Sequence, residues 1–197
     1  MSTSMKKIEE LVEQAVSAKQ RHGIFVLQFP PFEIPGLADR YGYQEDDEAL
    51  EAGRKIRNGD YSRENLMVIV QWKSRRSAHW LDDNSQIDIS RALRFACDPR
   101  TSEKSAIEVL DRLTGVGIPM ASAILTAAFP EKYTVIDWRA LESLGNDDTQ
   151  VQKIDYYLQY LTACRDFAAR FKVSLRTLDR ALWQWSKEQG KEDRCSC

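Results

Sequence analysis

The segment that most constrains the fold is a run of small and apolar residues at 120–129, which reads Met-Ala-Ser-Ala-Ile-Leu-Thr-Ala-Ala-Phe. A helix of this composition is apolar on nearly every side, so no face of it prefers water. It must be enclosed by other elements, and we expect it at the centre of the fold. The chain can enclose it, because 43% of its 197 residues are hydrophobic.

Most of the remaining chain has the spacing of apolar residues that is typical of helices. Ser62 and Ser102 stand where helix N-caps are expected, whereas three prolines between 23 and 36 predict an extended segment without helix. No pair of strands and no internal repeat is evident, so we expect an all-α fold. The predicted helices cover approximately residues 5–21, 46–58, 62–76, 87–97, 102–113, 137–145, 149–171 and 174–189.

A helix-hairpin-helix pattern, Leu-Thr-Gly-Val-Gly, occupies residues 113–117 between two of these helices. Its two glycines let the backbone turn tightly and approach another molecule closely, and Val116 is the apolar residue that would hold the turn closed. The next helix begins near Ile118 with Pro119 in its first turn. Its amides and its dipole therefore point out of the turn and predict a phosphate site. A plain turn between helices, with glycine as a C-cap and no ligand, is the alternative.

The sequence from Leu113 to Asp137 resembles the signature of the endonuclease III-like superfamily of DNA glycosylases, the helix-hairpin-helix/Gly-Pro/Asp group. The resemblance includes the hairpin, the apolar Ala-rich helix and the extended approach to an aspartate 18 residues after Pro119. It covers about residues 105–145. It implies that double-stranded, damaged DNA is the partner and that a damaged base is flipped out of the stack before it is excised.

The resemblance also implies a single bilobal domain over residues 1–197, with DNA bound in the cleft between two helical lobes. One lobe would comprise about residues 46–136 and would contain the hairpin. The other would comprise about residues 1–45 together with 138–197. We expect the hairpin and Asp137 on the rim of the same cleft.

Asp137 is the candidate catalytic residue. Cleavage of a glycosidic bond develops positive charge on the sugar, which a nearby carboxylate stabilises while it orients a water molecule. The other interpretation makes Asp137 the N-cap of a short helix, because Asp is favoured at that position, with Arg139 screening its charge. The two roles are compatible.

This sequence departs from the family pattern at two places. Bifunctional members carry a lysine nucleophile two residues after the second hairpin glycine, where this chain has Pro119. A proline cannot attack, so we expect monofunctional chemistry without lyase activity by that route. Only Cys195 and Cys197 lie near the C-terminus, so no iron–sulfur cluster and no other cofactor is expected. A monovalent cation on the Leu113 and Val116 carbonyls is a further expectation that the resemblance implies.

The DNA-contacting groups that we expect are hairpin residues and cations near the cleft. A predicted wedge region falls near 71–76, where a tryptophan could stack on a base or simply belong to the core. The cations of the last two helices, Arg165 to Arg180, form either a solvated or a DNA-facing surface, and Trp183 and Trp185 are assigned to the core. The predicted DNA contacts are Gly115, Val116, Gly117, Lys73, Arg75, Arg76 and Arg139, and the predicted base pocket or wedge residues are Trp72 and Trp138.

The overall charge restrains the functional interpretation. A net charge of −2 argues against tight, promiscuous DNA binding but permits a local basic surface. With no apolar segment of membrane-spanning length and no signal peptide, we expect a cytoplasmic protein.

The leading hypothesis is a monofunctional DNA glycosylase that hydrolyses the bond to a damaged base. The alternative is a catalytically inactive module that retains the fold and binds DNA or a protein.

Overall fold

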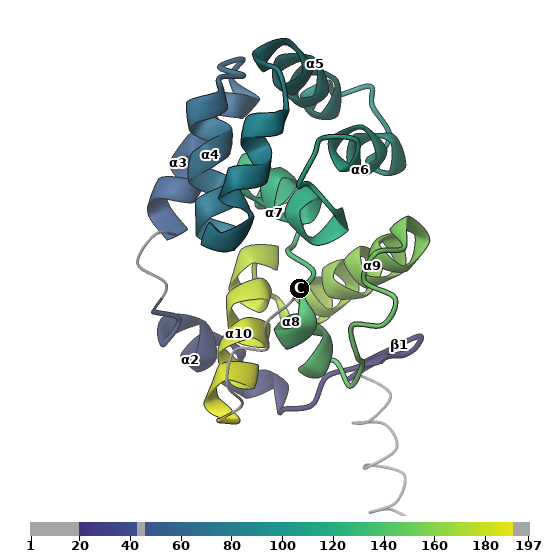
Figure 1. Cartoon of the computed structure of the whole chain (residues 1–197). Coiled ribbons are helices and arrows are strands. Elements are labelled where there is room, and N and C mark those ends of the chain that lie inside the picture. Colours follow the sequence, from purple (N-terminus) through teal and green to yellow (C-terminus); the bar gives the residue numbers. More distant parts are fainter. Residues whose placement is uncertain (1–19, 43–45, 191–197) are drawn as a thin grey trace, which may run out of the picture.

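The computed structural model describes residues 20–42 and 46–190. The described chain is mostly helical, which confirms the all-α prediction (Figure 1). Most of the helix predicted at 5–21 and the two C-terminal cysteines lie outside the described residues, and residues 20 and 21 are not helical.

Helix α7 (Ile118–Ala128) is the central element of one group of helices. Of its residues only Pro119 is not buried, so the predicted enclosed helix is confirmed. Helices α3 (Asp46–Arg57) and α4 (Arg63–Lys73) pack on it. Gly53 of α3 lies so close to the end of α7 that a Cβ atom there would meet the Ala127 carbonyl carbon at 2.1 Å. The absence of a side chain at Gly53 therefore sets how closely the two helices approach.

Two further α-helices and a long 3-10 helix complete this group. The 3-10 helix η2 (Arg75–Asp83) follows α4 directly and leads to α5 (Gln86–Cys97) and α6 (Glu103–Asp111). Both α-helices begin at serine N-caps. The Ser85 hydroxyl accepts a hydrogen bond from the Asp88 amide, and the Ser102 hydroxyl accepts one from the Ser105 amide. Figure 1 shows α3 to α7 gathered at one end of the molecule.

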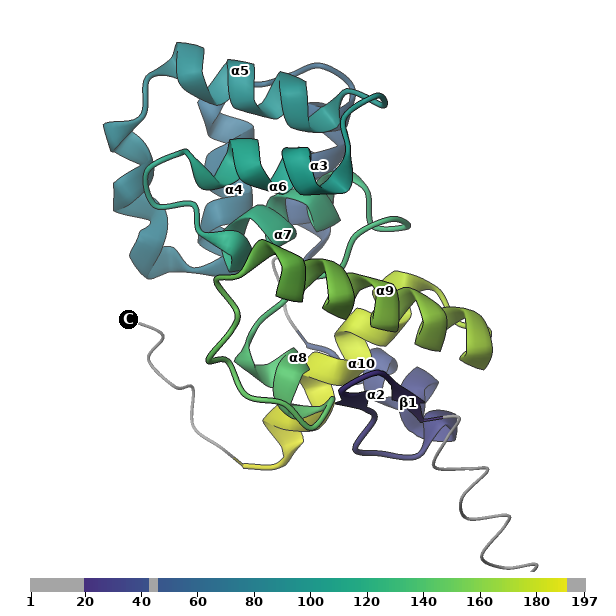
Figure 2. The same ribbon diagram turned by 90° about the vertical axis from the view of Figure 1, so that its right-hand side faces the viewer.

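The second group combines the two ends of the described chain. A short antiparallel pair, β1 (Arg21–His22) and β2 (Phe25–Val26), precedes η1 (Pro31–Glu33) and α2 (Ile34–Asp39). These elements lie beside α8 (Trp138–Glu142), α9 (Ile154–Phe171) and α10 (Leu175–Glu188) (Figure 2). One continuous hydrophobic cluster runs through both groups.

The proline-containing segment differs from the prediction. Residues 23–36 were expected to be extended throughout, yet α2 begins at Ile34, with Pro35 in its first turn. Proline lacks an N–H group, but the first turn has no partner for that group, so proline is compatible with a helix start. The two-residue strands were also not predicted. No helix within the described ranges is long and apolar enough to cross a bilayer.

Candidate nucleic-acid cleft

A cleft of about 1040 Å³ opens where the two groups of helices meet. Its walls come from the end of α4, the start of η2, the hairpin, the first turn of α7, the start of α8 and one side of α10. Gly115 and Asp137 therefore face one space, although neither helix periodicity nor spacing required it. The predicted site residues that line the cleft are Trp72, Lys73, Arg75, Arg76, Gly115, Gly117, Asp137, Trp138 and Arg139.

Asp137 has two partners in the cleft. Its Oδ1 atom accepts the Ala140 amide at 3.0 Å, so the predicted N-cap role is confirmed. Its Oδ2 atom accepts a hydrogen bond from Lys73 Nζ at 2.7 Å. The screening cation is thus Lys73 rather than the expected Arg139. The side chains of Lys73 and Asp137 are each 17% exposed, so the pair is sheltered but reachable from the cleft.

The electrostatic environment keeps Asp137 ionised. Burial raises the pKa of a carboxyl group, but the Lys73 ammonium, its hydrogen bond and the Ala140 amide together outweigh this effect. The pKa of Asp137 consequently lies below its ordinary value of 3.8. A carboxylate in this state is suited to stabilising positive charge in the cleft.

The extended segment before Asp137 is held by side chains from three helices. Asp179 of α10 accepts both the Thr134 hydroxyl at 2.7 Å and the Val135 amide at 3.1 Å. Ser122 of α7 accepts the Ile136 amide at 3.1 Å. From α9, the hydroxyl groups of two tyrosines donate to the carbonyls of residues 134 and 135. Because this backbone is buried and irregular, these bonds replace those that a helix or sheet would supply.

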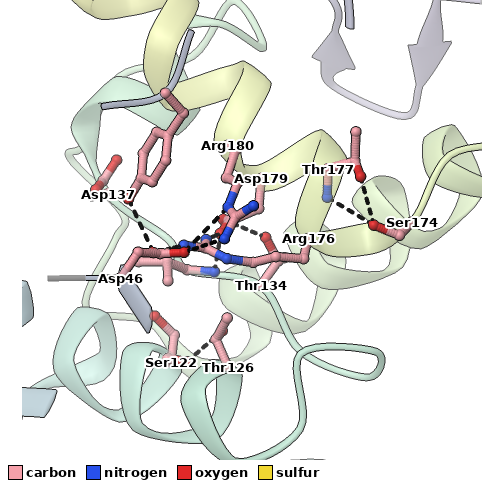
Figure 3. Close-up of polar contacts among 12 residues, drawn as sticks. Asp46, Ser122, Thr126, Thr134, Asp137, Ser174, Arg176, Thr177, Asp179 and Arg180 are labelled. Carbon is pink, nitrogen blue, oxygen red and sulfur yellow. Dashed lines mark hydrogen bonds and ion pairs between the residues drawn. The ribbon is translucent and has the colours of Figure 1, made fainter. Parts of the chain in front are cut away.

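A buried ionic network continues from Asp179 to the other group of helices (Figure 3). The Arg176 guanidinium bridges Asp179 and Asp46 at the start of α3, and Arg180 also donates to Asp46. The Arg176 guanidinium lies 5.5 Å from the Tyr41 ring centre and 5.6 Å from that of Trp72. Burial raises the pKa of Asp179 above its ordinary value, and Arg176 only partly offsets this effect. The network connects both groups of helices beneath the cleft.

The hairpin is closed by contacts that the sequence pattern did not indicate. Gly115 has φ +81, and a Cβ atom there would lie 2.4 Å from the Trp80 Cβ atom. The Asn84 side chain binds both the amide and the carbonyl of Thr114, at 2.7 and 3.0 Å. Val116 is 3% exposed, as expected of the residue that holds the turn closed.

The hairpin amides are partly engaged inside the protein. The Val116 amide donates to the Leu113 carbonyl at 3.0 Å, which closes the turn. The Ile118 amide donates to Gln152 Oε1 at 3.3 Å. That oxygen lies 3.0 Å from the position of a Cβ atom on Gly117. A neutral side-chain oxygen thus contacts the first amide of α7, where a phosphate was predicted. A cation on the two hairpin carbonyls stays a prediction.

Arg139 and Trp183 differ from expectation in their surroundings, whereas Trp72 follows the interpretation that assigned it to the core. Arg139 is 4% exposed and lies 4.3 Å from the Trp138 ring centre and 5.3 Å from that of Trp183. Arg139 is therefore a buried part of the cleft wall, unlike the exposed phosphate contact that was predicted. Trp183 lines the cleft instead of belonging only to the core. Trp72 is 5% exposed and packs in the core, with one edge on the cleft.

The C-terminal arginines are bound to groups of the protein itself, although Arg170 is also exposed to solvent. Arg165 pairs with Glu103 and donates to the Lys132 carbonyl. Arg170 pairs with Asp166 of the same helix and donates to the Arg21 carbonyl. Arg176 and Arg180 belong to the ionic network that joins α10 to α3.

Cysteine and metal chemistry is limited within the described residues. Cys97 and Cys164 are free thiols, and burial raises the pKa of Cys97 to about 11. No group of three or more His, Cys, Asp or Glu side chains in residues 20–42 and 46–190 could hold a metal ion.

Comparison of the chain with protein-family models, with curated proteins and with solved structures finds no match.

Proposed function

We propose that this protein binds damaged double-stranded DNA in the cleft and hydrolyses the N-glycosidic bond of a flipped base, with Asp137 assisting the reaction. The observation that carries this proposal is the position of Asp137 in the same cleft as the hairpin glycines and the start of α7. The reaction requires a carboxylate beside the sugar, a helix start that binds phosphate and enough space for a flipped nucleotide.

The charge of the cleft favours an anionic ligand over a neutral one. Five cationic side chains line it against three carboxylates, in a chain whose net charge is −2. Arg75 and Arg76 are exposed at the start of η2, next to the hairpin side of the cleft. Phosphate contacts by such groups supply the non-specific part of DNA affinity.

The aromatic side chains that line the cleft could stack on a flat ring. They are Tyr41, Trp72, Trp138 and Trp183, and the guanidinium groups of Arg139 and Arg176 lie beside them. Aromatic walls bind a base by stacking, which contributes roughly 1–3 kcal/mol per base. In the proposed complex, the hairpin and the cations hold the backbone while the base enters this aromatic region. Asp137 then lies beside the sugar and stabilises the positive charge that develops as the bond breaks.

The first test compares wild type with Asp137→Asn on a panel of duplexes that each carry one lesion. Wild type should release free base from at least one duplex, whereas Asp137→Asn should bind that duplex equally and lose most of the rate. Loss of one such electrostatic group costs roughly 3–4 kcal/mol in the transition state. Asn also caps helices well, so the fold should persist, as circular dichroism would show. Undiminished release by the variant would place the active site elsewhere.

A second candidate function is a catalytically inactive module that binds DNA without excising a base. It is favoured by the engagement of the Asp137 carboxylate with Lys73 and of the Ile118 amide with Gln152. Binding of lesion duplexes by wild type with no base release across the panel would support it.

A further inference from the structure

Two guanidinium groups lie against the four aromatic rings of the cleft. The Arg139 guanidinium lies 4.3 Å from the Trp138 ring centre and 5.3 Å from that of Trp183. The Arg176 guanidinium has the same relation to the other two rings, at 5.5 and 5.6 Å. Every aromatic ring that a base could stack on in this cleft therefore already interacts with a cation.

Arg139 is placed to affect a base that lies next to Asp137. It follows Asp137 by two positions, and its charge contributes to the lowered pKa of that carboxyl group. Arg139 is 4% exposed, so its guanidinium is sheltered from water, whereas Trp138 is half-buried and lines the cleft. A base that stacks on Trp138 would share that ring with the guanidinium.

A ring that already binds one cation is a poor partner for a second. The faces of an aromatic ring attract cations because they are electron-rich. With Arg139 against the Trp138 ring, a positively charged base would meet a weaker negative potential there. It would also be repelled by the guanidinium, and the repulsion is strong where water is excluded. An uncharged base keeps the stacking contact and is not repelled.

The carboxylates of the cleft do not reverse this effect. Asp137 pairs with Lys73 and Asp179 pairs with Arg176, so the charges of these two carboxylates are offset within the protein. Asp148 lies in the exposed connection between α8 and α9, where water and salt screen its charge. Because five cationic side chains line the cleft against these three carboxylates, its excess charge is positive.

We propose that the cleft selects uncharged damaged bases and rejects the cationic bases that alkylation of a ring nitrogen produces. Arg139 is the specificity-determining residue, and it acts through the Trp138 ring. This inference rests on the proposed function in that a damaged base must enter the cleft, and it adds the chemical class of that base. Oxidised and deaminated bases that carry no positive charge belong to the accepted class.

The test uses the full chain and two duplexes that differ only in one base. One duplex carries a single 3-methylcytosine, which is a cation at neutral pH, and the other carries a single 3-methyluracil, which is uncharged. The two bases have nearly the same shape, and the methyl group blocks the pairing edge of both, so neither is held in the stack by a partner. Fluorescence anisotropy measures the affinity for each duplex and for the undamaged one.

Wild type should bind the 3-methyluracil duplex about tenfold more tightly than the 3-methylcytosine duplex, which is the size of effect expected of one sheltered cation–π contact. Arg139→Met removes the charge and keeps a long side chain against the rings, so it should bind the two duplexes almost equally. Arg57→Met is the matched control, because Arg57 also lies over a ring, 5.9 Å from the Phe129 centre, and does not line the cleft. That variant should keep the wild-type preference.

The outcomes separate this proposal from base hydrolysis. Equal affinity of wild type for the two lesion duplexes, or tighter binding of 3-methylcytosine, overturns the selection whether or not the variants fold. Affinity no higher than for undamaged DNA also overturns it, because no base then enters the cleft. A preference that persists in Arg139→Met, folded by circular dichroism, overturns the role of Arg139. Base release without the preference supports the hydrolase and rejects the selection, whereas the preference without base release supports the selection and rejects the hydrolase.

Discussion

The low pKa of Asp137 depends most on Lys73, a side chain from a distant helix, with smaller contributions from the Ala140 amide and Arg139. In Lys73→Gln, burial would act on the carboxyl group without the ammonium that outweighs it, so the pKa of Asp137 should rise above that of wild type. Carbon-13 NMR of the Asp137 carboxyl group would follow its titration in both proteins. Lys73→Arg should keep the pKa low. If the titration midpoint of Asp137 is the same in Lys73→Gln as in wild type, Lys73 does not set the charge state of Asp137.

The same pair also makes stability depend on pH. Because the pKa of Asp137 is lower in the folded protein than its ordinary value of 3.8, the ion pair stabilises the fold above that value. The contribution is lost as the pH falls through the folded pKa. Lys73→Gln should therefore be less stable by about 2–3 kcal/mol at pH 7, slightly below the roughly 3–5 kcal/mol for a fully enclosed pair. The difference between the two proteins should narrow in acid.

The two hairpin glycines are predicted to respond differently to substitution. Gly115 has φ +81 and contacts Trp80, so Gly115→Ala combines left-handed strain with a clash and should destabilise by about 1–3 kcal/mol. Gly117 has φ −83, and its nearest neighbour is the movable end of Gln152. Gly117→Ala should leave thermal stability nearly unchanged but weaken DNA binding. Equal DNA affinity in Gly117→Ala would show that the start of α7 is not the phosphate site.

The extended segment at residues 134–136 should depend strongly on Asp179, which holds two of its polar groups and neutralises Arg176. Asp179→Ala would leave the buried Arg176 guanidinium with one carboxylate partner fewer. The free energy of unfolding should therefore fall by roughly 3–5 kcal/mol. Asp166→Ala removes contacts to Arg170 and His22 that are about a third exposed, and it should lower the free energy of unfolding by less than about 1 kcal/mol. Urea unfolding of the two variants would compare them. Similar losses of unfolding free energy in the two variants would mean that the ionic network does not stabilise this segment.

Across the whole molecule, the net charge and the local charge of the cleft have opposite signs. DNA binding should accordingly be weak at high salt and depend on a few cations. Replacing both Arg75 and Arg76 with Ala should reduce the slope of log affinity against log salt by about 2, because two phosphate contacts are lost. Arg54→Ala is the control, since Arg54 is paired with Glu51 on α3 and does not line the cleft. Fluorescence anisotropy at several salt concentrations would measure the slopes.

Several features could be predicted from local sequence because local chemistry determines them. The apolar run at 120–129 required an enclosed helix, and Ser102 and Asp137 start helices through their own hydrogen bonds. The glycine at 115 indicated a tight turn, which its positive φ confirms. Each of these depends on residues within a few positions of one another.

The partners of the polar groups were decided by tertiary structure alone. Lys73 meets Asp137 across 64 positions, and Asp46 meets Arg176 across 130. Periodicity shows which face of a helix is apolar, but it does not show which charged ends will meet once several helices have packed. The sequence by itself therefore determined most of the helices and the turn at the hairpin, but not α2 or η2. The packing of α4, α8 and α10 decided that Asp137 is paired with a lysine and that Arg176 is bound to Asp46 and Asp179.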